Sequence, residues 1–155
     1  MTATTDTASS AATGARRVDQ LLAHYGESHQ NSRNAVIHFI AIPLIALSLL
    51  GLLYTLHPNV AHAFLVASMV YYMRLSMVFF VSMALFSVAM LALVWAMGPQ
   101  VLPISLSIFV GAWILQFIGH KIEGKKPSFF EDLQYLWVGP LFVLSKLFVK
   151  LGVRW

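Results

Sequence analysis

The residues of this chain best suited to chemistry are its histidines, because imidazole nitrogen binds iron, zinc, copper and nickel. The chain has six histidines and no cysteine, which excludes thiolate metal sites of the zinc-finger or iron–sulfur type. His38 follows Asn31 and Asn34 at intervals that would place all three side chains on one face of a helix.

A second polar stripe surrounds His120. Gln116 precedes it by four residues and Glu123 follows it by three, so the three side chains again share one helical face. Both stripes interrupt apolar sequence, where unpaired polar groups are costly. The two stripes therefore need each other, or a metal ion. Asn34, Gln116 and Glu123 are candidate acceptors for the second N–H of a metal-bound imidazole.

The other histidines have a simpler interpretation, because polar side chains at a membrane interface often reach the head groups. This interpretation is favoured for His24, His57 and His62. It is disfavoured for His29, His38 and His120, which lie within or beside the polar stripes.

The elements that position these residues are predicted to be membrane-spanning helices. The chain of 155 residues is 59% hydrophobic and only 10% charged, whereas a soluble domain is about 25% charged. Four apolar runs cover residues 36–56, 60–73, 76–97 and 101–119. A membrane span needs about 20 residues, so the second run is short. We predict an all-α, polytopic membrane protein with four transmembrane helices.

The basic residues support this topology. If all four runs cross the membrane, every lysine and arginine lies on one side, which the positive-inside rule makes cytoplasmic. Both termini are then cytoplasmic, in a bacterial inner membrane or in the endoplasmic reticulum of a eukaryote. His57 and His62 would lie across the membrane from His38 and His120, about 30 Å away and out of reach of a shared ion.

The two ends of the chain differ from the apolar middle. Residues 1–15 are small and polar and are predicted to form a disordered tail, and residues 16–155 form a single domain that begins with a short amphipathic helix. Near the C-terminus, Ser128 and Glu131 have the spacing of a capping box. Gly139 and Pro140 then fall inside the helix that this box would start. We predict a kinked helix in the plane of the cytoplasmic surface, with a re-entrant segment as the alternative.

Two stretches of the chain resemble a known family. One is YGESHQNSRNAVIHFIAIP at residues 25–43, and the other is WILQFIGHKIEGKKP at residues 113–127. Together they are similar to the Mpo-type family, formerly a domain of unknown function. Its fungal member is an Fe(II)-dependent 2-hydroxy fatty acid dioxygenase of the endoplasmic reticulum.

The resemblance implies a site and a reaction. The implied ligands of Fe(2+) are His29, His38 and His120, with Glu123, Asn34 and Gln116 as further catalytic residues. The implied substrates are a 2-hydroxy fatty acid and O₂. Cleavage between C1 and C2 would release CO₂ and a fatty acid one carbon shorter, which is the reaction of fatty acid alpha-oxidation. Membrane lipids are expected partners, and no nucleic acid is expected.

Two other functions remain open. The chain could be a metal- or lipid-binding membrane protein without catalytic activity. It could also be a small transporter whose polar stripe lines a solute path. A transporter needs polar residues at the middle of the bilayer, and residues 46–53 and 82–93 carry only scattered serine there, which counts against this function.

Overall fold

A computed structural model of the chain describes residues 16–27, 31–124 and 136–155. Within these ranges the chain forms helices joined by short turns, without a strand, so the predicted all-α class is confirmed. The predicted tail at residues 1–15, His29 and the predicted capping box at Ser128 and Glu131 lie outside the described residues. The helices are α2 (Arg17–Glu27), α3 (Ser32–Leu56), α4 (Pro58–Leu75), α5 (Met77–Ala96), the 3₁₀ helix η1 (Gly98–Gln100), α6 (Val101–Glu123) and α8 (Val138–Leu151).

Local sequence explains where the long helices begin and end. His57 is both the C-cap of α3 and the N-cap of α4. As the N-cap, its Nδ1 accepts a hydrogen bond of 3.1 Å from the backbone N–H of Asn59. Pro58 follows in the first turn of α4, where a missing N–H costs nothing. The C-cap of α6 is Gly124. Its φ of 76° is the left-handed conformation that glycine adopts without strain.

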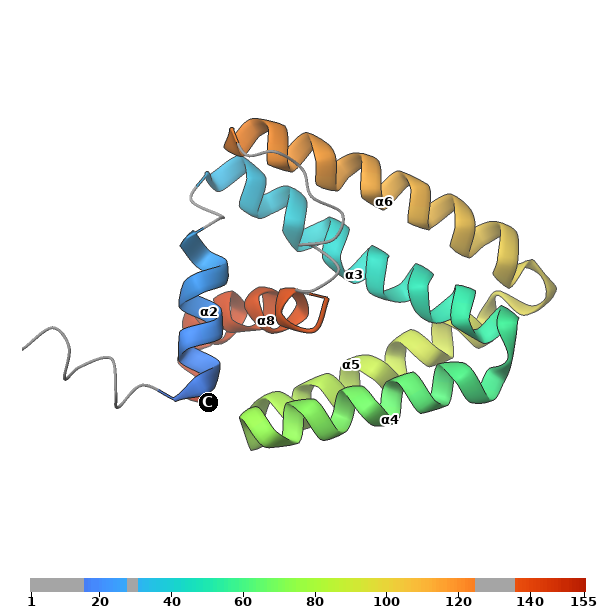
Figure 1. Cartoon of the computed structure of the whole chain (residues 1–155), viewed down its shortest axis with the longest axis horizontal. Coiled ribbons are helices and arrows are strands. Elements are labelled where there is room, and N and C mark those ends of the chain that lie inside the picture. Colours follow the sequence, from blue (N-terminus) through green and yellow to red (C-terminus); the bar gives the residue numbers. More distant parts are fainter. Residues whose placement is uncertain (1–15, 28–30, 125–135) are drawn as a thin grey trace, which may run out of the picture.

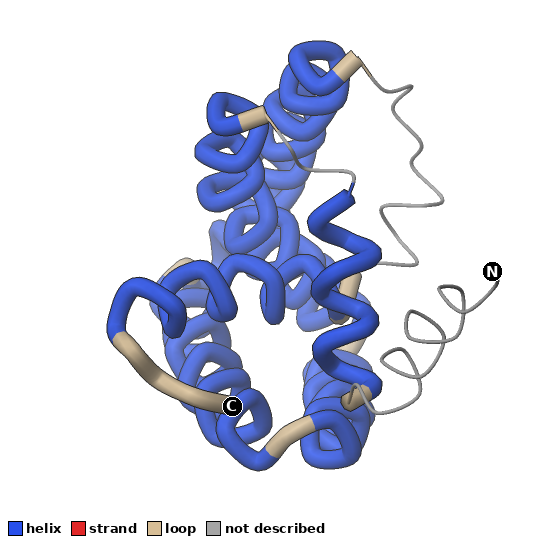
Figure 2. Tube along the Cα trace, turned by 90° about the vertical axis from the view of Figure 1, so that its left-hand side faces the viewer, coloured by secondary structure: helices blue, strands red, loops and turns tan. Residues whose placement is uncertain are grey.

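The four long helices run back and forth along one direction (Figure 1). Helices α3 and α6 are antiparallel and pack against each other along their length, while α4 and α5 form a helical hairpin that packs against α3. Helices α2 and α8 pack together at the end where α3 begins, and α2 runs across that end of the molecule (Figure 2). The first turns of α3 and the last turns of α6 therefore meet beside α2 and α8.

Three segments are long and apolar enough to cross a membrane: α3, α5 and the stretch Gly98–Glu123 that contains α6. These segments are consistent with the predicted membrane protein. The second apolar run does form a helix, α4, but its 18 residues are not among the candidate spans. Four crossing helices therefore stay a prediction.

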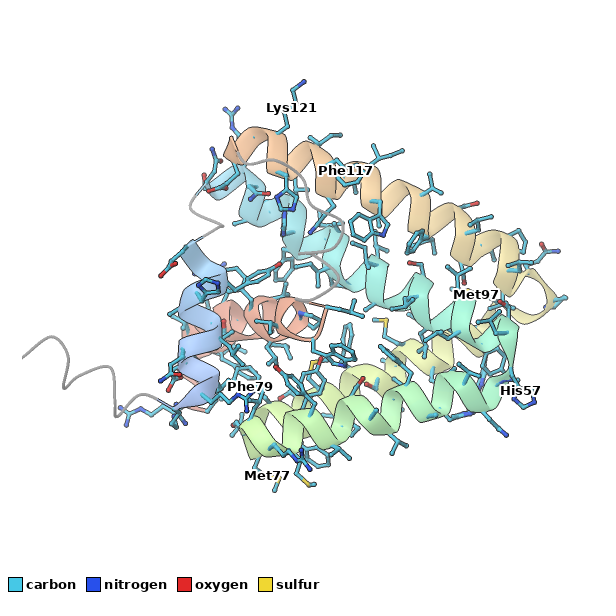
Figure 3. All side chains as sticks on the ribbon, viewed as in Figure 1. His57, Met77, Phe79, Met97, Phe117 and Lys121 are labelled. Atoms are coloured by element: carbon cyan, nitrogen blue, oxygen red, sulfur yellow. The ribbon has the colours of Figure 1, made fainter. Side chains whose placement is uncertain are left out.

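The lysine and arginine residues of the described helices gather at one end of the helical array. Arg33 begins α3, Arg74 ends α4 and Lys121 ends α6, and these helix ends lie together with α2 and α8. Figure 3 shows Lys121 at this end and His57 at the opposite end. The turns at the opposite end, from α3 to α4 and from α5 to α6, carry no lysine or arginine.

The C-terminal helix differs from its prediction. Leu136 and Trp137 form a turn, and α8 begins at Val138, so Gly139 and Pro140 lie in its first turn and produce no kink in its middle. Proline is tolerated there because the first N–H groups of a helix have no partner within the helix. The start of α8 is buried against α3, with Gly139 next to the side chain of Ile42. An orientation in the membrane plane stays a prediction.

Candidate functional site

His38 and His120 meet where the beginning of α3 packs against the end of α6. Their ring centroids are 5.3 Å apart and the ring planes make an angle of 72°. Both side chains are buried, with 1% of His38 and 8% of His120 exposed. The proximity of these two imidazoles, predicted from antiparallel helices, is confirmed by this geometry. Their role as metal ligands stays a prediction.

Gly119 allows the two helices to approach this closely. A Cβ at this position would overlap Oδ1 of Asn34 and would lie 3.2 Å from both Cδ2 and Nε2 of His38. Asn34 is fully buried in the same contact. Sequence reasoning passed over Gly119 as a site residue, although the glycine directly before His120 in the stretch QFIGH was a visible signal.

Asn34 and Gln116 join His38 and His120 in a buried cluster of four polar side chains, which we call the polar centre. Nε2 of Gln116 lies 3.5 Å from Nδ1 of His38, at the limit of a hydrogen bond. Among the residues that the structure describes, Oε1 of Gln116 and Oδ1 of Asn34 are buried and have no hydrogen-bond partner. Buried acceptors of this kind are rare in folded proteins and call for a donor or a cation. Both predicted amides thus lie in the centre, one from each helix.

Glu123 ties the end of α6 to the beginning of α3. Its carboxylate accepts hydrogen bonds of 3.1 Å from the backbone N–H of Asn31 and of 2.9 Å from Nδ2 of Asn34. Asn31 is the N-cap of α3, and its own side chain accepts a hydrogen bond from the N–H of Arg33. A carboxylate at a helix N-terminus is stabilised by the free N–H groups and the helix dipole. The geometry gives Glu123 a positioning contact at the N-terminus of α3.

The arrangement fits a nitrogen-ligated metal ion in part. Metal–nitrogen bonds of about 2.0 to 2.1 Å put the centres of two imidazoles that share an ion roughly 4.5 to 6.5 Å apart, a range that includes the observed separation. The amide oxygens without a hydrogen-bond partner in the described residues, Oδ1 of Asn34 and Oε1 of Gln116, belong to residues at the same contact between α3 and α6. Within the described ranges, however, no third His, Asp or Glu joins the two imidazoles in a metal-binding group. The third predicted ligand, His29, lies outside those ranges.

The histidines at the opposite end have other surroundings. His57 caps α4 as described above, and His62 is exposed on the first turns of that helix. Figure 3 shows His57 at the C-terminal end of α3, whereas His38 lies near the N-terminal end of that helix. Neither side chain belongs to the polar centre, which agrees with the interpretation from the sequence.

Comparison with known proteins identifies the family. No curated protein and no solved structure matches the chain. The sequence profile of the family described as "2-hydroxy-palmitic acid dioxygenase Mpo1-like" matches residues 15–151. This range contains α2 through α8 and every residue of the polar centre. The chain therefore belongs to the 2-hydroxy-palmitic acid dioxygenase Mpo1-like family.

Proposed function

We propose that this protein is a membrane-embedded, Fe(II)-dependent dioxygenase that shortens 2-hydroxy fatty acids by one carbon. The observation that carries the proposal is the buried pair of imidazoles, His38 and His120, at the end of an apolar helix pair. The family name supplies the reaction class and the type of substrate. A long-chain substrate agrees with a site flanked by helices long and apolar enough to lie in a membrane.

The proposed reaction consumes one O₂ for each 2-hydroxy acid. The bond between C1 and C2 breaks, C1 leaves as CO₂, C2 becomes the carboxyl carbon of the shortened acid, and one water forms. Fe(II), when bound, supplies open coordination positions for the hydroxy acid and O₂ and the redox chemistry for the cleavage. His38 and His120 would hold the ion together with His29.

Gln116 and Asn34 have distinct roles in this proposal. Nε2 of Gln116 faces Nδ1 of His38 at 3.5 Å. A rotation of that amide by about 180° would present its oxygen, which would accept the N–H at Nδ1 and leave the lone pair at Nε2 of the ring for a metal. This ring nitrogen lies next to Gly119 of α6, since a Cβ on that glycine would be 3.2 Å from it. Asn34 is held by Glu123 through a hydrogen bond of 2.9 Å. Glu123 and Asn34 therefore position α3 against α6, while Gln116 orients the ring of His38.

We also propose that α3, α4, α5 and α6 all cross the membrane with both termini in the cytoplasm. The support is the gathering of lysine and arginine at one end of the helices. Helix α4 is then a short span beside longer ones, and its packing against α3 and α5 contributes to its place in the membrane. Reporter fusions to each terminus test this topology, and a reporter outside the cytoplasm at either terminus would contradict it.

The function itself is tested on protein purified in detergent. We expect bound iron and the conversion of 2-hydroxy-palmitic acid with O₂ into CO₂ and a C15 acid. Iron without turnover of any 2-hydroxy acid would refute the dioxygenase and favour the non-catalytic metal-binding protein. Absence of iron after reconstitution under anaerobic conditions with Fe(II) would refute the metal centre as well.

A further inference from the structure

A groove lies between the first turns of α3 and the middle of α8, next to the polar centre. Its volume is about 490 Å³, within the range of small-molecule sites, roughly 300 to 1,000 Å³. His38 is the one residue of the polar centre that lines it. The other lining residues are Ala35, Val36 and Phe39 of α3 and Phe142, Val143, Lys146, Leu147 and Lys150 of α8.

Both walls of the groove carry exposed apolar side chains. On α3, Val36 and Phe39 are 62% and 51% exposed, and on α8 Leu147 is 40% exposed. These side chains repeat at intervals of three or four residues along their helices, so each wall is a continuous stripe. The groove thus connects a long apolar surface with the buried imidazole of His38.

Positive charge lies along the α8 wall. Lys146 Nζ is 4.9 Å from the centroid of the Phe142 ring, so its ammonium group is turned back along the helix toward the groove. Lys150 lines the same groove one turn further on. In the described part of the chain, neither lysine forms an ion pair with a carboxylate. An anionic group in this groove would therefore lie beside the ammonium groups of Lys146 and Lys150.

We propose that this groove binds the 2-hydroxy fatty acid, with Lys146 binding its carboxylate beside His38 and the alkyl chain lying along Val36, Phe39 and Leu147. This inference rests on the proposed function and adds the surface that receives the substrate. A groove that combines apolar side chains with the ammonium groups of Lys146 and Lys150 is complementary to a molecule with an alkyl chain and one anionic head group. Lys150 adds positive charge that attracts the carboxylate to the groove.

A labelling experiment tests the groove without relying on turnover. The probe is 2-hydroxy-palmitic acid with a photoreactive diazirine in its alkyl chain, added to the full-length protein in detergent. We expect crosslinks on residues 35–39 and 142–150, and we expect competition by unlabelled 2-hydroxy-palmitic acid. Crosslinks confined to α4 and α5, or equal competition by a phospholipid, would overturn the proposal.

Paired variants test the shape of the groove. Leu147→Trp fills the groove, whereas Val149→Trp adds the same bulk on the same helix at a residue that is 68% exposed and does not line it. We expect Leu147→Trp to reduce labelling at least tenfold and Val149→Trp to leave it unchanged. Equal labelling of the two variants would contradict the proposal.

The role of Lys146 is tested by binding of the acid and of its methyl ester. A charged hydrogen bond contributes roughly 10- to 100-fold in affinity, so Lys146→Ala should weaken binding of the acid by that factor and barely affect the neutral ester. Arg74→Ala removes a basic residue at the same end of the protein, outside the groove, and should change neither. Equal weakening of acid and ester would give Lys146 a structural role only.

These outcomes separate the two proposals. Labelling in the groove without turnover of 2-hydroxy acids would refute the proposed function and support the groove as a fatty-acid site. Turnover that is insensitive to Leu147→Trp and Lys146→Ala would support the dioxygenase and refute the groove.

Discussion

At both ends of the α3–α6 pair, a glycine of one helix faces side chains of the other without room for a Cβ. At the end near α2, Gly119 faces Asn34 and His38. At the opposite end, Gly51 faces Ser105, and a Cβ there would overlap Oγ of Ser105 and lie 3.0 Å from its Cβ. At both ends, a glycine at the helix contact allows the backbones of α3 and α6 to approach closely.

The polar groups at the two ends are satisfied differently. Near Gly51, Ser48 is fully buried and donates to the backbone carbonyl of Ile45 on its own helix. Near Gly119, the hydrogen bonds of Asn34 and Gln116 run between helices, to Glu123 and toward His38. Close packing alone therefore does not make a site. The site arises where close packing brings polar groups of two helices to one point.

The largest expected effect separates the histidines of the two ends. His38→Ala and His120→Ala should each remove most of the bound iron and the dioxygenase activity, because each would delete a ligand. His29→Ala should do the same. His57→Ala should keep both and cost about 1 kcal/mol of stability through loss of the α4 cap, and His62→Ala should be near neutral. Iron content and turnover of 2-hydroxy-palmitic acid measure the contrast. Loss of activity in His57→Ala together with retention of activity in His38→Ala would contradict the assignment of the site to the end near α2.

The two glycines provide a matched pair of substitutions. Gly119→Ala and Gly51→Ala should each destabilise the protein by about 1 to 3 kcal/mol, because the added methyl group forces the helices apart. Only Gly119→Ala should also lose iron and activity, since it displaces Asn34 and His38. Adding Ser105→Ala should partly restore the stability of Gly51→Ala. Thermal unfolding in detergent and metal analysis of the folded protein measure both effects. A folded Gly51→Ala protein without iron would break the comparison.

The amides should show a smaller effect. Asn34→Ala and Gln116→Ala should each lower activity or iron affinity by about 10- to 100-fold, because Asn34 and Gln116 position the ligands and are not ligands themselves. Ser105→Ala, a buried polar residue at the other end of α6, should leave both near the wild-type value. Iron titration of each variant gives the comparison. An affinity of Gln116→Ala equal to that of the unaltered protein would remove Gln116 from the site.

The smallest effect is expected at Ser48. Ser48→Ala removes a hydroxyl that bonds to the carbonyl three residues earlier, so it should cost about 1 kcal/mol of stability or less and leave activity unchanged. Thermal unfolding and turnover in parallel check this. A loss of activity would mean that the end near Gly51 communicates with the polar centre.

Much of the fold followed from patterns that act within one segment of the chain. Apolar runs predicted the long helices because a continuous apolar stretch of this length is stable as a helix in a membrane. The turn residues at His57 and Gly98 predicted the breaks between them. The start of α8 was missed because Gly139 and Pro140 suggested a kink, whereas packing against α3 makes them the first turn of a helix.

The sequence by itself also determined which residues form the two polar stripes, since helical periodicity is a local property. It predicted that His38 and His120 lie at the same depth, because antiparallel neighbours of similar length bring those ends together. Only the tertiary structure decided how the side chains of the two stripes contact each other. The approach of the helices at Gly119, the use of Glu123 at the N-terminus of α3 and the groove between α3 and α8 depend on contacts between segments far apart in the chain. Those contacts are set by how whole helices pack, which helical periodicity within one segment does not specify.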